Sequence, residues 1–199
     1  MTFRKMRVVL LRAVFVPVIF LFLFVSPSWP NDSVLDFLIE VPGYLLLMVG
    51  LGLRIWSVLY IGQRKSKQLI TDGPYSLCRN PLYLGTFAIA IGAGLVLVNL
   101  PMAAFTALVF IPVHVWVARA EERHLQGIFG REYEDYRRTV PAFLPRWRNY
   151  RTRQEIPVSM RAMWKVSMEA SLILLIPPVR ELVEVLHTYA LIPVLWRFP

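Results

Sequence analysis

A polar segment at residues 71–85, TDGPYSLCRNPLYLG, contains residue types that can bind a charged ligand. Asn80-Pro81 predicts the start of a helix, because asparagine is a good N-cap and proline is tolerated in the first helical turn. A helix N-terminus offers unpaired N–H groups and a partial positive charge to an anion. Arg79 would complete a site for a carboxylate or a phosphate, although the same pattern also describes a well-capped helix without a ligand.

Two adjacent acids, Glu121 and Glu122, provide the opposite charge. If one of them lies opposite Arg79, the site has one pole for an anion and one for a cation, which suits an amino-acid moiety. The alternative is a solvated helix end at which the acids are offset by Arg119 and Arg123.

Aromatic residues follow the acids in the chain. Tyr133 and Tyr136 lie three positions apart and therefore share one face of a helix, and Phe129 precedes them. They could form a wall for a planar base, or they could be the aromatic residues that are common at a bilayer surface. No spacing of His, Cys, Asp or Glu predicts a metal site.

The composition indicates that a membrane protein carries these residues. The 199-residue chain is 56% hydrophobic and only 18% charged, and its apolar residues come in blocks. The net charge of +9 comes mostly from basic residues that flank apolar runs. This is the positive-inside pattern, which argues against nucleic-acid binding and predicts a cytoplasmic N-terminus and a cytoplasmic site. The compact chain favours the cell (inner) membrane over an endomembrane.

Four apolar runs predict transmembrane helices, at residues 13–25, 41–61, 82–98 and 102–118. The first run could instead be a signal peptide, but the sequence VSPSWP after it lacks a small-residue cleavage site. Asn99-Leu100-Pro101 forms an uncharged turn, so the third and fourth spans make an antiparallel hairpin. This hairpin returns Glu121 to the membrane face that carries Arg79.

Other residues in and after the spans predict local features. Arg54 inside the second span is either a functional or paired residue, or an arginine that extends towards an aqueous end. Pro112 predicts a kink in the fourth span. The charged region after it should end one helix at Phe129-Gly130 and form a short helix over 131–138.

The C-terminal tail contains two apolar pieces, 171–179 and 189–196, interrupted around Pro177-Pro178, and neither is long enough to span a membrane. A broken helix, a re-entrant hairpin and an interfacial helix all fit this pattern. The predicted fold is therefore all-α, a multi-pass transmembrane protein with four N-terminal spans and such a C-terminal segment. The predicted regions are spans one and two (1–62), a core (63–153) and the tail (154–199).

Three pieces of this sequence together resemble a known family. GPYSLCRNPLYLG, the pair Glu121-Glu122 and FGREYEDYRRTVPAFLP are similar, in order and spacing, to the isoprenylcysteine carboxyl methyltransferase and phospholipid methyltransferase superfamily of integral membrane enzymes. The resemblance implies a methyltransferase that binds S-adenosylmethionine at the cytoplasmic ends of spans three and four. It also implies a lipidic or amphipathic acceptor, such as a prenylated cysteine carboxylate, a phospholipid amine or a similar lipid-soluble nucleophile.

By motif position, the resemblance implies a set of cofactor-binding residues, which are Tyr75, Arg79, Asn80, Pro81, Tyr83, Gly85, Glu121, Glu122, Tyr133, Tyr136 and Pro145. Arg79, Asn80 and Glu122 are the candidate catalytic residues. Asn80 stands where the family usually has histidine, and asparagine cannot titrate near neutrality, so we assign no general base there. Methyl transfer from a sulfonium tolerates this, because it depends mainly on positioning and on nearby charge.

Two other functions fit parts of the sequence. An NADPH-dependent sterol-type membrane reductase would share the R-x-P-x-Y-x-G pattern and the tyrosine-rich segment, although 199 residues is short for such an enzyme. A non-catalytic membrane binding protein could retain the pocket, and Asn80 favours this alternative. The expected partners are an amphipathic small molecule and membrane lipids, with no nucleic acid and no metal.

Overall fold

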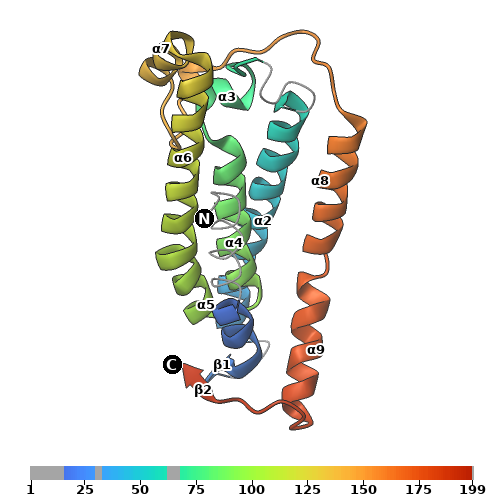
Figure 1. The fold of residues 1–199 in the computed structure, drawn as a ribbon. Coiled ribbons are helices and arrows are strands. Elements are labelled where there is room, and N and C mark those ends of the chain that lie inside the picture. Colours follow the sequence, from blue (N-terminus) through green and yellow to red (C-terminus); the bar gives the residue numbers. More distant parts are fainter. Residues whose placement is uncertain (1–15, 30–32, 62–67, 199) are drawn as a thin grey trace. The chain divides into compact units, whose positions relative to one another are not determined.

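The computed structural model describes residues 16–29, 33–61 and 68–198, most of which are helical (Figure 1). The chain divides into two compact units. The first unit consists of Met1–Met48, Ala88–His114 and Leu172–Pro199, and the second consists of Val49–Phe87 and Val115–Ser171. The predicted regions 1–62, 63–153 and 154–199 are consecutive in sequence, whereas each compact unit gathers distant segments.

Within the described residues, two helical stretches are long and apolar enough to cross a membrane. They are α2 (Val34–Ile61) and the continuous stretch Leu100–Phe129. Helix α4 (Pro81–Val96) is apolar but has 16 residues, which is about 24 Å of helix against a hydrocarbon core of roughly 30 Å. Residues 16–24 of the first predicted span are helical, and its start at 13–15 lies outside the described residues. The predicted count of four spans is therefore not confirmed.

The stretch Leu100–Phe129 changes helix type along its length. It begins with α5 (Leu100–Phe105), whose N-cap Asn99 accepts a hydrogen bond from the Met102 N–H at 2.9 Å. A π-helical segment, η1 (Thr106–Phe110), then precedes α6 (Ile111–Phe129). Pro112 lacks an N–H, so a carbonyl one turn earlier loses its usual partner, and the wider π turn lies just before this proline, at the point where the sequence predicts a kink.

In the first unit, glycines bring α2 and α4 into backbone contact. A Cβ on Gly92 would lie 2.8 Å from the Gly43 carbonyl oxygen, and a Cβ on Gly43 would lie 2.8 Å from the Val96 nitrogen. Small residues of this kind let helices approach closely where hydrophobic exclusion from water cannot drive their packing.

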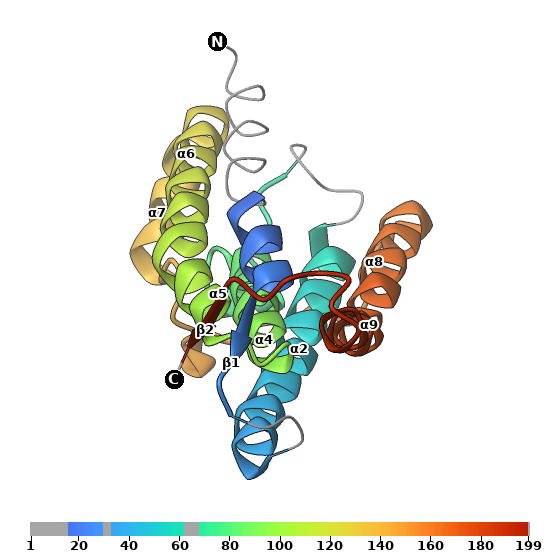
Figure 2. The same cartoon turned by 90° about the horizontal axis from the view of Figure 1, so that it is seen from below.

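A short parallel pair of strands departs from the all-α prediction. β1 (Val25–Pro27) pairs with β2 (Trp196–Phe198), with Val25 opposite Trp196, and Figure 2 shows the two strands side by side. The pairing joins segments near opposite ends of the chain, so no local pattern could reveal it. The sequence had placed Val25 at the end of the first span and Trp196 at the end of the second apolar piece of the tail, with the other strand residues beyond them.

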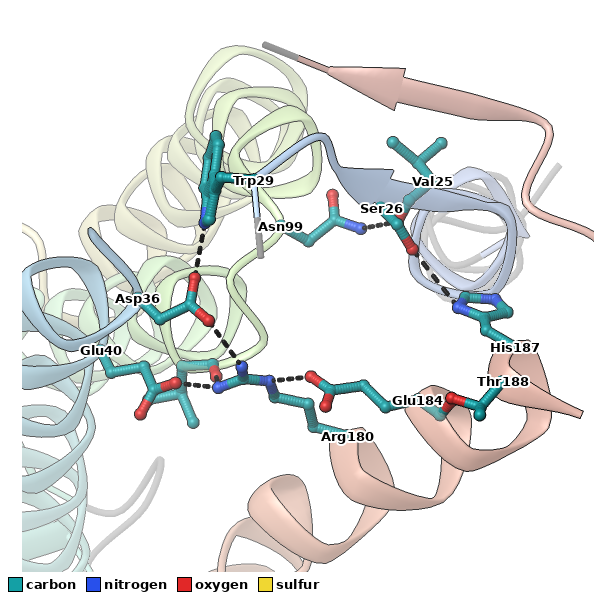
Figure 3. Close-up of polar contacts among 11 residues, drawn as sticks. Val25, Ser26, Trp29, Asp36, Glu40, Asn99, Arg180, Glu184, His187 and Thr188 are labelled. Carbon is teal, nitrogen blue, oxygen red and sulfur yellow. Dashed lines mark hydrogen bonds and ion pairs between the residues drawn. The ribbon is translucent and has the colours of Figure 1, made fainter. Parts of the chain in front are cut away.

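The tail forms two helices, α8 (Met160–Ile173) and α9 (Ile176–Thr188), which is the broken-helix alternative. The break falls just before Pro177 and Pro178 because both prolines occupy the first turn of α9, where their missing N–H groups cost nothing. In α9, Arg180 forms ion pairs with Asp36 and Glu40 of α2 and with Glu184 of its own helix (Figure 3). These ion pairs fasten α9 to the N-terminal part of α2 within the first unit.

The second unit contains the C-terminal part of α2, the start of α4, most of α6, and α8 up to Ser171. It also contains α3 (Pro74–Leu77), α7 (Arg131–Thr139) and η2 (Trp147–Asn149). Arg54 of α2 donates a hydrogen bond to Thr86 at 2.6 Å and forms an ion pair with Glu169 of α8. Arg54 is therefore a paired residue, and its contacts tie three helices of this unit together.

Candidate functional site

Backbone hydrogen bonds hold the motif segment against the chain that follows α7. The Arg79 N–H donates to the Pro141 carbonyl at 2.8 Å, and the Asn80 N–H donates to the Ala142 carbonyl at 3.1 Å. In the other direction, the Arg146 N–H donates to the Leu77 carbonyl at 3.0 Å. Two stretches about sixty residues apart therefore form one frame at the start of α4.

Arg79 makes most of the side-chain contacts within this frame. Its Nε and Nη2 donate to the two carboxylate oxygens of Glu122, at 3.0 and 3.1 Å. Its Nη1 donates to the carbonyls of Val140 at 2.7 Å and Arg137 at 3.2 Å. Burial alone would lower the pKa of Arg79, but the hydrogen bond and charge of Glu122 outweigh this and raise it. The guanidinium thus stays charged and uses four of its five N–H hydrogens within the protein.

Asn80 also contacts Glu122. Its Nδ2 donates to Glu122 Oε1 at 2.6 Å and to the Ala142 carbonyl at 3.2 Å, and the residue is buried. Glu122 therefore accepts hydrogen bonds from two neighbouring residues of the motif. In this arrangement Asn80 acts as a neutral hydrogen-bond donor to a carboxylate, which requires no titrating group.

Glu121 has different surroundings from its neighbour. Its Oε2 accepts a hydrogen bond from the Tyr83 hydroxyl of α4 at 2.9 Å. Among the residues that the structure describes, no arginine, lysine or histidine forms an ion pair with Glu121. The negative charge of Glu121 is therefore not neutralised within the described protein, whereas that of Glu122 is.

A cavity of about 240 Å³ lies beside these groups. Small-molecule sites typically have roughly 300 to 1,000 Å³, so this cavity suits a compact ligand or part of a larger one. It is lined by Ile61, Gln68, Leu69, Ile70, Tyr75, Arg79, Asn80, Leu82, Tyr83, Glu121, Glu122, His124, Leu125, Phe129, Tyr133 and Tyr136.

Three tyrosines of the cavity, Tyr75, Tyr133 and Tyr136, are buried and protonated. Burial raises the pKa of Tyr75 and of Tyr136 well above the usual range, and burial followed by the charge of Glu122 raises the pKa of Tyr133 to about 12. The Tyr136 hydroxyl donates to the Tyr75 carbonyl at 2.7 Å. The Tyr75 hydroxyl has no hydrogen-bond partner in the described chain. A buried polar group without a partner is costly, and a ligand in the cavity is one source of the missing partner.

The structure brings together most of the residues predicted for cofactor binding. Those that line the cavity are Tyr75, Arg79, Asn80, Tyr83, Glu121, Glu122, Tyr133 and Tyr136.

Three predicted residues lie outside it. Pro81 is buried in the first turn of α4, and Pro145 is exposed after α7. Gly85 packs against α2, where a Cβ would come 2.7 Å from the Gly50 carbonyl oxygen. Their positions in the motif therefore correspond to packing and turn formation.

Several apolar and polar lining residues were not predicted. Leu125 follows Glu121 by four residues on α6, on the same helix face as the predicted Phe129, so helical periodicity from the acid could have found it. Gln68, Leu69 and Ile70 precede the motif in the chain and carry no recognisable signal.

Comparison with known proteins bears on this region directly. Residues 39–132 match the family model described as phospholipid methyltransferase. The match covers a little under half of the chain. The predicted superfamily resemblance is thereby confirmed, and the matched range includes every cavity residue except Tyr133 and Tyr136 of α7.

Individual relatives of this phospholipid methyltransferase-like chain carry two kinds of name. The nickel-cobalt-cadmium resistance protein NccN of Alcaligenes xylosoxydans xylosoxydans is 38% identical over 125 residues, which cover 63% of this chain and 56% of that protein. The cobalt-zinc-cadmium resistance protein CzcN of Cupriavidus metallidurans is 39% identical over 131 residues, or 65% and 59%. The protein-S-isoprenylcysteine O-methyltransferase of Schizosaccharomyces pombe is 33% identical over 98 residues, or 49% and 42%.

The chain thus matches a little over half the length of the two resistance proteins and less than half of the yeast methyltransferase. No solved structure matches it. Among the described residues, no group of three or more His, Cys, Asp or Glu side chains is arranged to hold a metal ion.

Proposed function

We propose that this protein is an integral membrane methyltransferase that uses S-adenosylmethionine and acts on a lipidic or amphipathic acceptor. The observation that carries the proposal is the cavity at the ends of α4 and α6, which lies in the family-matched region and whose described lining residues carry one surplus negative charge. Arg79 and Glu122 neutralise each other there, and Glu121 remains. Since S-adenosylmethionine carries a sulfonium, an ammonium and a carboxylate, its net charge of about +1 complements this cavity.

The lining residues also fit the shape and polarity of this cofactor. Phe129 and Tyr75 offer aromatic surface to a planar base, and the unpartnered Tyr75 hydroxyl offers a hydrogen bond. Glu121 would hold the positive end of the ligand, and the Tyr83 hydroxyl keeps that carboxylate in place.

This assignment changes the expected roles of the candidate catalytic residues. Arg79, Asn80 and Glu122 bind chiefly to one another, so we propose that they position the motif segment and shape the cavity. When bound, S-adenosylmethionine supplies an electrophilic methyl group. Leu82, Leu125 and Phe129 would exclude water from it, and Glu121 would orient it.

The acceptor class rests on the setting of the cavity and on the relatives. The apolar stretches α2 and Leu100–Phe129 contribute residues to the cavity wall, so we propose that the acceptor reaches it from the bilayer. The name of the Schizosaccharomyces pombe relative describes methyl transfer to an isoprenylcysteine, which is an acceptor of this class. The basic residues around the motif support a cytoplasmic cavity.

Titration of the purified protein in a neutral detergent tests the proposal. Isothermal calorimetry with S-adenosylmethionine and, separately, with NADPH should show one bound S-adenosylmethionine per chain and no NADPH. Binding of NADPH alone would instead support the reductase alternative. A second step uses S-adenosylmethionine with a labelled methyl group and a membrane lipid extract. Binding without any labelled lipid would favour a non-catalytic binding protein, the function that Asn80 kept open.

A further inference from the structure

A second cavity of about 480 Å³ adjoins the proposed donor cavity and shares Arg79, Glu122 and Tyr133 with it. Arg119, Arg123 and Gln126 of α6 form one wall, and their spacing of four and three residues places them on a single helix face. Arg137 of α7 contributes from a different helix. We call this second cavity the basic groove.

The basic groove carries a strong surplus of positive charge. Among the described residues, Glu122 is the only acid that lines the groove, and this carboxylate is already paired with Arg79. Arg119, Arg123 and Arg137 are exposed, and none of them forms an ion pair with another described residue. Three unneutralised guanidinium groups from two helices therefore converge on one space, where like charges repel unless an anion lies between them.

Tyr133 also lines the groove, beside Arg79 and Arg137. Its exposed fraction is only 1%, and its hydroxyl lies close enough to Arg79 for the guanidinium to act on its pKa through charge and a hydrogen bond. The groove is therefore bordered by a buried tyrosine as well as by its arginines.

We propose that the basic groove binds the anionic head group, a phosphate or a carboxylate, of an amphipathic lipid. Arginine guanidinium groups match both anions because they donate parallel hydrogen bonds. The groove is open to the surface through its arginines, as a lipid head group requires. This inference rests on the proposed function in one respect, because it assigns the groove to the polar end of the methyl acceptor.

The two cavities then have opposite charge preferences. The donor cavity has a surplus negative charge on Glu121, whereas the groove has surplus positive charge on its arginines. The Arg79–Glu122 pair contributes to both and is neutral. A cationic donor and an anionic acceptor would thus be sorted into adjoining spaces by electrostatics alone.

The test uses short-chain lipids that dissolve as monomers, with the full-length protein in a neutral detergent. The probes are dihexanoyl phosphatidic acid, dihexanoyl phosphatidylcholine and inorganic phosphate. We expect phosphatidic acid to bind about tenfold more tightly than either other probe, and the double variant Arg123→Gln/Arg137→Gln to lose about that factor. The matched control Arg161→Gln removes one exposed arginine of α8 outside both cavities and should keep the wild-type affinity.

Other results would overturn the proposal. If Arg161→Gln loses about as much binding free energy per arginine removed as the groove variant does, surface charge alone attracts the lipid. Inorganic phosphate that binds as tightly as phosphatidic acid would mean a free-anion site. If Arg123→Gln/Arg137→Gln does not fold, as judged by circular dichroism, Arg119→Gln/Arg123→Gln replaces it under the same expectations.

The wild-type protein separates this inference from the proposed function. If the wild-type protein binds phosphatidic acid but not S-adenosylmethionine, the proposed methyltransferase function is refuted and the lipid site in the groove stands. If it binds S-adenosylmethionine but not phosphatidic acid, the lipid site is refuted and the methyltransferase function stands.

Discussion

The ion pair between Arg79 and Glu122 gives a prediction whose size follows from the structure. Breaking a buried ion pair by removing one partner costs roughly 3 to 5 kcal/mol, because the other charge is left unpaired. The two side chains are 11% and 15% exposed, so some solvation remains. We therefore expect Arg79→Gln to lower the free energy of unfolding by about 3 kcal/mol and Glu122→Gln by about 2 kcal/mol, since Arg79 keeps two carbonyl acceptors.

The double variant Arg79→Gln/Glu122→Gln distinguishes this explanation from a general loss of packing. It leaves no unpaired charge, so its loss should fall short of the sum of the single variants by about 2 kcal/mol. Urea unfolding in a neutral detergent, followed by far-ultraviolet circular dichroism, measures all three values. Both single variants should also weaken S-adenosylmethionine binding, because the pair holds the motif segment to α6. Additive losses within error, or unchanged binding in both single variants, would refute the role assigned to the pair.

Three further predictions test separate parts of the structure. Asn80→Asp places a second carboxylate against Glu122, whose Oε1 lies 2.6 Å from the Asn80 amide nitrogen in the wild-type protein. Two like charges in contact raise the pKa of the pair, so the variant should lose stability as the pH rises from 5 to 8. Equal stability of the variant at pH 5 and pH 8 would contradict the contact. Burial raises the pKa of the Cys78 thiol from 9.0 to about 11. The contribution of this thiol to stability is therefore complete below pH 9 and declines as the pH rises towards 11. Alkylation of Cys78 by iodoacetamide at pH 8 should be slow in the folded protein and become fast only after unfolding. Gly85→Ala should destabilise the protein by about 1 to 3 kcal/mol, because the added Cβ would meet a backbone oxygen of α2. The control Gly52→Ala should not destabilise it, because nothing lies within 4 Å of a Cβ there. Equal melting temperatures of the two variants would refute the contact at Gly85.

Much of the site could be predicted from the sequence because its parts lie on regular helices. The hairpin argument brings Glu121 and Arg79 to the same end, and the structure places both in one cavity. The ion pair between Arg79 and Glu122 was not predicted. Spacing along a helix cannot show which of two adjacent acids turns towards a neighbouring arginine. For the same reason the motif did not distinguish Gly85, which packs against α2, from the residues that line the cavity.

The fold was predictable where it depends on local patterns. Helix α7 begins at Arg131 and α6 ends at Phe129, followed by Gly130 with a φ of 52°, as the turn signal predicts. The β1–β2 pair was not predictable, because it depends on a contact between the two ends of the chain. The count of four spans stays a prediction, because α4 ends at Val96, two residues before the predicted end of the third span, and the first span begins outside the described residues.

The central claim is that Glu121 supplies the charge that binds a cationic methyl donor. The affinities of wild-type protein and Glu121→Gln for S-adenosylmethionine and for the uncharged product S-adenosylhomocysteine test it most directly, with Glu132→Gln on the exposed face of α7 as the matched control. The variant should lose about tenfold or more in affinity for S-adenosylmethionine, a smaller factor for S-adenosylhomocysteine, and nothing in the control. Equal affinity of Glu121→Gln and wild-type protein for S-adenosylmethionine would contradict the claim.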